Sequence, residues 1–292
     1  MLRIGVLDSG VGGLTTVQAL FALRADIEVV YVADNAQGAY GSKTEAQIRA
    51  GTQAMLSFLA AQKVDVIAVA CNTISSTLTL AEYTRYEQQY QCPIISIIDP
   101  MVAQLKARPT NTTLGLIATP FTIANGRYAQ QLQQIGVEVA GVASAHLASW
   151  VEQASVHPNA SFATKIDTAI QHALMHLYAQ SPALDSIILG CTHYPFVQDR
   201  FEALAPKVSF LNPAQAHAES VLAHLPLRAA FRLDANTRSQ PKALSAQPTL
   251  WLSTSGDTQS YVVFARQLGL PACVAIEAGA EFMPRKGFDA VG

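Results

Sequence analysis

Residues 64–73 read Val64-Asp-Val-Ile-Ala-Val-Ala-Cys71-Asn-Thr73, and residues 184–193 read Leu184-Asp-Ser-Ile-Ile-Leu-Gly-Cys191-Thr-His193. Each stretch is a short apolar run of the kind that forms a strand buried on both faces of a parallel sheet. Each run ends in a cysteine, and two polar residues and a helical pattern follow it. The repetition predicts two similar half-units, each with a cysteine at the carboxyl end of a strand.

A second repeat pairs residues 4–13 with residues 114–122, each a strand, a polar turn and a helix start. Between and around the repeats, apolar runs alternate with amphipathic stretches along most of the chain. We predict strands at 4–7, 28–33, 64–70, 94–98, 114–118, 137–142, 186–189, 249–252 and 273–276. We predict helices at 14–23, 45–61, around 166–177 and at 257–268. Further helices should follow the strand at 64–70 and end near residue 90, follow the strand at 114–118 and end near residue 135, and begin at residue 196.

This order predicts an α/β fold of two pseudo-symmetric, doubly wound domains with mainly parallel sheets, and an active site in the cleft between them. The pattern restarts after Pro100, and residues 208–211 suit a return crossing. We therefore expect a first domain of residues 1–98 plus 209–292 and a second domain of residues 99–208. The polar stretch 228–247 has no clear period and predicts a loop.

The composition excludes several classes of protein. The chain has 292 residues, half of them apolar, and a formal net charge of −2, which does not favour nucleic acid as a partner. The longest apolar runs, such as 64–70, are too short to cross a membrane. Residues 2–7 resemble a strand rather than a secretory signal, so we expect a cytoplasmic protein. The four cysteines are scattered without a Cys-x-x-Cys pair, which favours neither zinc nor disulfides.

Polar side chains gather at the predicted strand ends, where open α/β sheets bind their ligands. They are Asp8, Ser9, Cys71, Asn72, Thr73, Thr119, Cys191, Thr192 and His193. Each is near the start of a predicted helix, where free N–H groups favour anions and lower the pKa of a thiol. We expect Cys92 and Cys273, which lie in or beside apolar strands, to be structural.

Several other patterns have more than one interpretation. Asp8 either serves the site or caps the helix that begins near Gly13. The turn from Asp8 to Gly13 is rich in glycine, but Thr15 replaces the third glycine of a dinucleotide motif and no phosphate-binding lysine follows. His172 and His176 are four residues apart, but no third metal ligand is evident, so we expect a solvated helix face. Tyr83, Tyr86 and Tyr90 form a helical stripe that favours packing or a subunit contact over a ligand site.

The sequence resembles the glutamate racemase family along nearly its whole length. Six blocks carry the resemblance: Gly5-Val-Leu-Asp-Ser-Gly-Val-Gly-Gly-Leu14, Ala33-Asp-Asn-Ala-Gln-Gly-Ala-Tyr-Gly41, Ala70-Cys-Asn-Thr73, Ile98-Asp-Pro100, Ala118-Thr-Pro-Phe-Thr-Ile-Ala-Asn-Gly-Arg-Tyr128 and Leu189-Gly-Cys-Thr-His-Tyr-Pro195. The resemblance implies an isomerase that interconverts L- and D-glutamate with neither cofactor nor metal. It also implies a supply of D-glutamate for peptidoglycan, and a homodimer, which is common in the family.

The resemblance also assigns roles to residues at matching positions. Cys71 and Cys191 are the acid/base pair, and Asp8 and His193 assist the thiols. The substrate-binding residues are Asp8, Ser9, Tyr40, Gly41, Asn72, Thr73, Thr119, Thr122, Thr192 and His193. The chain departs from the family pattern at Ala39, at Asn125 and at Ala145-His-Leu-Ala, where many members have Cys-Pro. We transfer no residue from this last segment, Glu152 included.

Two thiols suit this chemistry because inversion at Cα needs one base and one acid on opposite faces, each with a pKa not far from neutral.

Three alternative functions stay open. The first is an aspartate racemase or a related two-cysteine isomerase. The second is a binding or regulatory protein, because some family members inhibit DNA gyrase. We expect no such contact, since the chain has no basic tract beyond the modest 228–242 region. The third is a pyridoxal-phosphate racemase, for which no lysine lies in a suitable motif.

Overall fold

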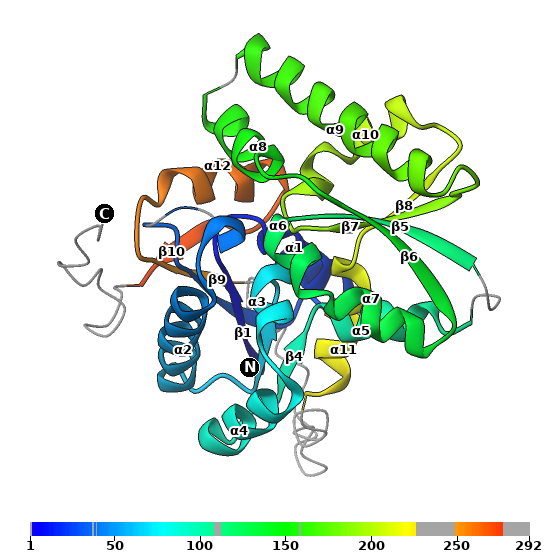
Figure 1. The fold of residues 1–292 in the computed structure, drawn as a ribbon. Coiled ribbons are helices and arrows are strands. Elements are labelled where there is room, and N and C mark those ends of the chain that lie inside the picture. Colours follow the sequence, from blue (N-terminus) through cyan, green and yellow to red (C-terminus); the bar gives the residue numbers. More distant parts are fainter. Residues whose placement is uncertain are drawn as a thin grey trace, which may run out of the picture.

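Two parallel sheets form the centre of the fold, as Figure 1 shows. The structure is a computed structural model that describes residues 2–36, 38, 40–107, 112–157, 159–225 and 249–276. The first sheet contains β1 (Leu2–Asp8), β2 (Ile27–Ala33), β3 (Val66–Val69), β4 (Ile94–Ser96), β9 (Thr249–Thr254) and β10 (Cys273–Ala275), in the order β10-β9-β2-β1-β3-β4. The second contains β5 (Thr112–Ala118), β6 (Val137–Ala143), β7 (Ser186–Gly190) and β8 (Ser209–Leu211), in the order β6-β5-β7-β8.

Helices connect the strands, as parallel pairing requires. Those that follow strands of the first sheet, or the short helix η1 (Tyr40–Ser42), are α1 (Leu14–Leu23), α2 (Glu45–Ala61), α3 (Asn72–Thr77), α4 (Leu80–Tyr90), α5 (Ile98–Leu105) and α12 (Gln259–Gln267). Those that follow strands of the second sheet, or η2 (Tyr194–Val197), are α6 (Pro120–Asn125), α7 (Arg127–Gln134), α8 (Leu147–Val156), α9 (Ala160–Gln180), α10 (Gln198–Leu204) and α11 (Ala214–Ala223).

The two sheets share one internal plan, and the predicted fold class is confirmed. The order β2-β1-β3-β4 matches the order β6-β5-β7-β8 when each strand is replaced by its counterpart. The pairing register matches too, because Gly5 pairs with Ile67 and Gly115 pairs with Ile187. These four positions are equivalent in the two sequence repeats, so each repeat occupies the same place in its sheet.

Each sheet is buried by helices on both faces, which explains its nearly continuous apolar strands. On the first sheet, Val6 packs in the cluster that includes Leu14 of α1 and Phe264 of α12. The adjacent Leu7 packs on the other face with Met55 of α2. On the second sheet, α8, α9 and α10 cover one face, and α5 and α7 cover the other, as Figure 1 also shows. Burial of each large aliphatic side chain contributes roughly 1.5–3 kcal/mol.

Some helix and strand boundaries in the structure agree with the predicted ones, and others differ because of capping residues. The helices α1 and α2 begin and end at the predicted residues. The single helix expected up to about residue 90 is two helices, because Leu78 is extended and Thr79 caps α4 together with Glu82. The strand expected over 94–98 ends at Ser96. Its hydroxyl accepts the N–H of Ile98, where α5 begins. Pro100 therefore lies in the first turn of α5 and ends no strand.

The domain division stays a prediction, and one strand bears on it. The strand β8 pairs with β7 in the second sheet, although we expected the first domain to resume at residue 209. We therefore propose that the chain returns after Leu211, with α11, which packs against α1. The loop expected over 228–247 lies outside the described residues.

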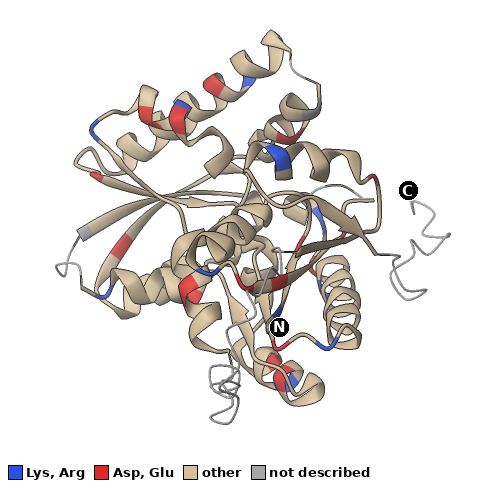
Figure 2. Cartoon of the chain, turned by 180° about the vertical axis from the view of Figure 1, so that it is seen from behind, with Lys and Arg blue, Asp and Glu red and all other residues tan. Residues whose placement is uncertain are grey.

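Charged residues are spread over the described elements. Figure 2 shows acidic and basic positions interspersed rather than gathered on one face. In the part of the chain that the structure describes, no helix is long and apolar enough to cross a membrane.

Candidate active site

The carboxyl ends of the two sheets face each other across a small cavity. Its lining residues are Ser9, Tyr40, Gly41, Cys71, Asn72, Thr73, Thr119, Ala148, Cys191, Thr192 and His193. Ten of them are residues predicted from the sequence, and Ala148 is the addition. The remaining predicted residues, Asp8 and Thr122, hydrogen-bond to lining residues. Both thiols therefore border one space, although 120 positions separate them in the chain.

Cys71 is the residue before α3, and its side chain is buried. The Ser9 hydroxyl lies 3.5 Å from its sulfur atom. Burial raises the pKa of Cys71 to about 12, and the charge of Asp8 adds to this shift. A bond from the Ile74 N–H opposes the shift and is outweighed. The expected lowering of the thiol pKa is therefore wrong for Cys71, because burial dominates over one short helix of six residues.

Cys191 belongs to a chain of three polar side chains. Its sulfur lies 3.9 Å from Nδ1 of His193, and Nε2 of that ring lies 3.2 Å from a carboxylate oxygen of Glu152. Burial lowers the pKa of His193, but the hydrogen bonds to Cys191 and Glu152 outweigh it. The net pKa of His193 is raised well above its usual value. A protonated His193 can therefore donate toward Cys191 from one ring nitrogen and toward Glu152 from the other.

Glu152 is the residue that the sequence reasoning left out. It lies on α8, a helix that the sequence pattern did not predict. A usable signal was present, because Glu152 is the only acid between residues 139 and 166. Only the fold brings it to His193, 41 positions further along the chain.

Asp8 joins the two sheets rather than capping a helix. One carboxylate oxygen accepts the N–H of Gly10 at 2.8 Å, and the other accepts the hydroxyl of Thr192 at 3.2 Å. The helix α1 begins after Gly13 without a side-chain cap, so the capping interpretation is wrong. Burial raises the pKa of Asp8 to about 6, against the opposing charge of His193 and these two hydrogen bonds.

The glycine-rich turn after Asp8 allows a close approach between the two sheets. A Cβ atom at Gly12 would lie 2.1 Å from the Thr192 hydroxyl, and one at Gly13 would lie 2.8 Å from the Tyr31 hydroxyl. That hydroxyl donates to the carbonyl of Gly10 at 2.6 Å. Gly12 is therefore explained by packing against Thr192 and Gly13 by packing against Tyr31 of its own sheet, and no nucleotide motif is needed to account for either glycine.

Threonine hydroxyls form a cluster at the cavity, which Thr73 and Thr119 line. Those of Thr73 and Thr119 lie 3.0 Å apart, and Thr119 donates to Thr122 at the same distance. Thr73 comes from α3 and the other two from α6 and the residue before it, so this cluster also joins the two sheets.

The amide side chain of Asn72 and the hydroxyl of Tyr40 also line the cavity. Tyr128 donates to the side-chain oxygen of Asn72 at 2.7 Å. The amide nitrogen of Asn72 is buried and has no partner among the described residues. Tyr40 donates to Asp34 at 2.7 Å, and Ser255 donates to the other oxygen of that carboxylate at 2.6 Å. Asn72 thus offers a free donor, whereas the hydroxyl of Tyr40 is already engaged.

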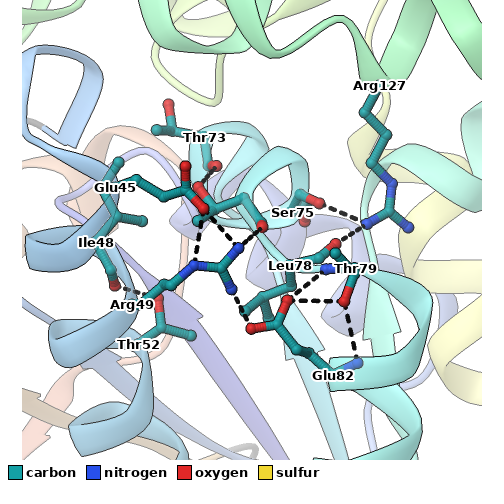
Figure 3. A network of polar contacts seen from close by, with 11 residues as sticks. Glu45, Ile48, Arg49, Thr52, Thr73, Ser75, Leu78, Thr79, Glu82 and Arg127 are labelled. Carbon is teal, nitrogen blue, oxygen red and sulfur yellow. Dashed lines mark hydrogen bonds and ion pairs between the residues drawn. The ribbon is translucent and has the colours of Figure 1, made fainter.

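Two arginines hold the far end of α3, as Figure 3 shows. Arg127 of α7 donates to the carbonyls of Ser75 and Leu78 and forms an ion pair with Asp99 at 3.0 Å. Arg49 of α2 donates to the carbonyl of Thr77 at 2.9 Å and forms ion pairs with Glu45 and Glu82. The helix that carries Asn72 and Thr73 is therefore fixed from both sheets.

The remaining candidates lie outside this site. Cys92 is buried and Cys273 is half-buried, as expected for structural residues. Tyr83 and Tyr86 pack in the core, and Tyr86 stacks on Tyr90. The ring nitrogens of His172 and His176 lie 3.1 Å apart. Among the described residues, no group of three or more His, Cys, Asp or Glu side chains could hold a metal ion.

The sequence model of the Asp/Glu/Hydantoin racemase family matches residues 13–221. This chain belongs to that family. Its members include the "Glutamate racemase" of Desulforudis audaxviator, which is 32% identical over 269 residues, 90% of this chain and 92% of that protein. The "Glutamate racemase" of Latilactobacillus sakei is 30% identical over 267 residues, 90% of this chain and 89% of that protein. The chain is thus an isomerase of the racemase class.

Solved racemase structures share the fold. Glutamate racemase RacE1 from Bacillus anthracis matches with a TM-score of 0.76 and 26% identity, over 94% of this chain and 97% of that chain. Glutamate racemase from Thermus thermophilus, solved in complex with β-chloro-D-alanine, matches with a TM-score of 0.72 and 28% identity, over 97% and 98%. The racemase fold therefore spans both sheets and the cavity between them.

Proposed function

We propose that this racemase interconverts L- and D-glutamate, with Cys71 and Cys191 as the two acid/base groups. The observation that carries the proposal is the pair of thiols on one cavity, each at the carboxyl end of an equivalent strand. The glutamate racemases that align with 90% of this chain support glutamate as the substrate. The roles of the site residues rest on this geometry and on the family resemblance.

The reaction needs only proton transfers. A thiolate takes the Cα proton from one face of the substrate and becomes a thiol, leaving the electron pair on Cα and its carboxylate. The opposite thiol gives its proton to the other face and becomes a thiolate. The product is the mirror-image amino acid, and the two sulfur atoms have exchanged protonation states. The reverse reaction starts from the exchanged state.

The surroundings of the two thiols indicate which of them carries a proton before the substrate reacts. With a pKa of about 12, Cys71 holds its proton near neutral pH. His193, whose pKa is raised, lies 3.9 Å from the sulfur of Cys191 and 3.2 Å from a carboxylate oxygen of Glu152, so it can exchange a proton with that thiol. Cys191 is therefore the first base in our proposal, and Cys71 is the first acid.

Polar groups around the thiols can hold the substrate. The free amide N–H of Asn72 is a donor for a carboxylate, and the carboxylate of Asp8 suits the ammonium group. Hydroxyls of Ser9, Thr73 and Thr119 add donors from both sheets. Fixed donors of this kind stabilise the charge that develops on the α-carboxylate during proton removal.

The cavity is nearly closed. Its volume is about 20 Å³, which is room for roughly one water molecule. An amino acid therefore requires the two sheets to move apart, and the contacts Asp8–Thr192, Asn72–Tyr128 and Thr73–Thr119 must open. Closure over the substrate would then exclude water from the carbanion.

The cellular role follows from the product. We propose that the D-glutamate is used for peptidoglycan, and that the enzyme works in the cytoplasm, without a cofactor, as a homodimer. Sedimentation of the purified enzyme tests the dimer, and a single monomeric species at micromolar concentration would contradict it.

Circular dichroism of purified enzyme with D-glutamate, and with D-aspartate in a parallel cell, tests the substrate. We expect the signal to decay only with D-glutamate and without added cofactor. Decay only with D-aspartate would replace the substrate and keep the two thiols. No decay with either amino acid would contradict the proposed function.

Serine variants in deuterium oxide test the two thiols. We expect Cys71→Ser and Cys191→Ser each to lose at least about a thousandfold in turnover, because each removes one of the two proton-transfer groups. Cys92→Ser, at a buried thiol outside the cavity, is the matched control and should keep near-normal turnover. The product enantiomer should gain deuterium at Cα. Near-normal turnover by either catalytic variant would falsify the two-base assignment.

A further inference from the structure

The helix α8 separates the catalytic cavity from a second hollow. Ala148 and Glu152, four residues apart, lie on its catalytic side, where Ala148 lines the cavity and Glu152 contacts His193. His146 and Trp150, also four residues apart, line a groove on the other side. A helix repeats every 3.6 residues, so these two pairs lie on different faces of α8.

The groove lies between α8, α9 and the residues after β6, where Figure 1 shows the two helices side by side. Its volume is about 610 Å³, which is within the usual range for small-molecule sites. The lining residues are Ala143, Ser144, Ala145, His146, Trp150, Ser161, Thr164, Lys165, Thr168, Ala169, His172 and Ala173. No residue of the catalytic cavity is among them.

The lining has a definite chemistry. The rings of His146 and Trp150 stack with centroids 5.4 Å apart and an angle of 30° between their planes, and they form an aromatic wall. Lys165 is exposed, with its ammonium group 5.2 Å from the centroid of the Phe162 ring, and the lining contains no Asp or Glu. Ser144, Ser161, Thr164 and Thr168 add hydroxyls. An aromatic wall beside an ammonium group that no lining carboxylate neutralises complements a planar ring with an anionic substituent.

We propose that this groove binds a small planar aromatic anion and that its occupation changes catalytic turnover through α8. The ring packs on Trp150 and His146, and the anionic group lies at Lys165. The binding stands on the groove alone, whereas the change in turnover rests on the proposed racemase function.

The two sides of α8 are mechanically connected. Ser144 lines the groove, and its carbonyl accepts the hydroxyl of Tyr194 at 3.3 Å. Tyr194 directly follows His193, which Glu152 contacts from α8. A ligand that moves α8 or the Ser144 segment therefore changes the position of the His193 ring relative to Cys191. Since that ring lies 3.9 Å from the Cys191 sulfur, the rate of proton transfer should change with it.

Fluorescence titration with 8-anilinonaphthalene-1-sulfonate tests the binding without any substrate. The probe is an aromatic sulfonate, and its uncharged analogue N-phenyl-1-naphthylamine carries the same rings without the anion. We expect saturable binding of the sulfonate, with affinity lowered about fivefold in Lys165→Met. The analogue should bind both proteins equally. Lys207→Met, at an exposed lysine outside the groove, is the matched control and should not weaken the sulfonate.

A filling variant locates the probe. Thr168 is exposed on α9 and lines the groove, so Thr168→Trp should fill it and weaken the sulfonate more than about tenfold. Unchanged binding in this variant, or equal sulfonate affinity in wild type and Lys165→Met, would overturn the site. Matching far-UV circular dichroism and melting temperatures show that the variants are folded.

Turnover tests the coupling. Saturating sulfonate should change kcat for D-glutamate at least about twofold in wild type and leave Thr168→Trp unaffected. Groove binding with no effect on kcat would overturn the coupling. If the enzyme racemises no glutamate but the three binding results hold, the proposed function fails and the ligand site stands.

Discussion

Asp8 is fully buried at the end of β1, and its carboxyl pKa is raised to about 6 from about 3.8. A raised carboxyl pKa means that stability is fully present below pH 4 and is lost as the pH rises through 6. Asp8→Asn removes this loss of unfolding free energy, because the asparagine side chain does not titrate. Between pH 4 and pH 8 the variant should gain up to about 3 kcal/mol in unfolding free energy relative to wild type.

Urea unfolding at the two pH values measures this gain, and racemisation should fall in the same variant because Asp8 is a proposed site residue. The result would be a protein that loses less stability between pH 4 and pH 8 than wild type and that is less active. An identical pH dependence of unfolding in both proteins would show that the Asp8 carboxylate is not destabilising.

His217 is buried between α11, β4 and α1. Its Nε2 lies 3.0 Å from the carbonyl of Ile95, and its Nδ1 lies 3.4 Å from the hydroxyl of Thr16. Burial lowers the pKa of His217 to about 4. A lowered histidine pKa means that the unfolded chain binds the proton first, so stability is present above pH 6.5 and is lost as the pH falls toward 4.

His217→Gln should flatten this acid dependence, since glutamine does not titrate. Wild type should lose up to about 3 kcal/mol of unfolding free energy between pH 7 and pH 4 that the variant keeps. His157→Gln, at an exposed histidine, is the control and should follow wild type. Parallel curves for wild type and His217→Gln would contradict the assignment.

At the scale of elements, α3 is too short to be stable by itself, so its position depends on the arginines at its end. Arg127→Lys and Arg49→Lys each replace a planar fork by a single ammonium group and should each cost about 1 kcal/mol of stability. Of the two arginines, only Arg127 comes from a helix of the second sheet, next to Tyr128, which contacts Asn72.

We therefore expect Arg127→Lys to lower kcat roughly tenfold and Arg49→Lys to leave kcat within about twofold. Steady-state kinetics beside thermal melting separates the two effects. Equal kcat values at equal stability loss would mean that Arg127 stabilises the fold without positioning α3.

The elements also show where sequence patterns are informative. A regular apolar stripe predicted α1 and α2 to the residue, because stripe residues such as Leu14 and Val17 in α1 and Ile48 and Met55 in α2 are the ones that the fold buries. The helix α8 has no side-chain cap at His146 and carries small and polar residues, so its pattern was weak. Its apolar side chains become informative only once the second sheet is there to bury them.

At the scale of the whole molecule, the glycine at position 12 decides how closely the two sheets approach. A methyl group there would overlap the Thr192 hydroxyl. Gly12→Ala should therefore hold the cavity partly open and lower kcat/KM about tenfold or more, with a small change in melting temperature.

Gly141→Ala is the control, because its new methyl group would lie at an ordinary 3.4 Å from Ile123. It should keep near-normal kcat/KM. Wild-type kinetics in Gly12→Ala would show that closure tolerates the methyl group, and that the Asp8–Thr192 contact is not needed for turnover.

The sequence alone determined the two repeats, and with them the α/β class with mainly parallel sheets and the equivalent places of Cys71 and Cys191. Such features depend on neighbours in the chain, on periodicity and on the chirality of parallel connections. The tertiary structure decided the rest. Glu152 meets His193, Thr192 meets Asp8, and the burial of Cys71 reverses the effect of its helix. Charge states and contacts between distant residues depend on burial and on distances through space, which exist only after both sheets have packed together.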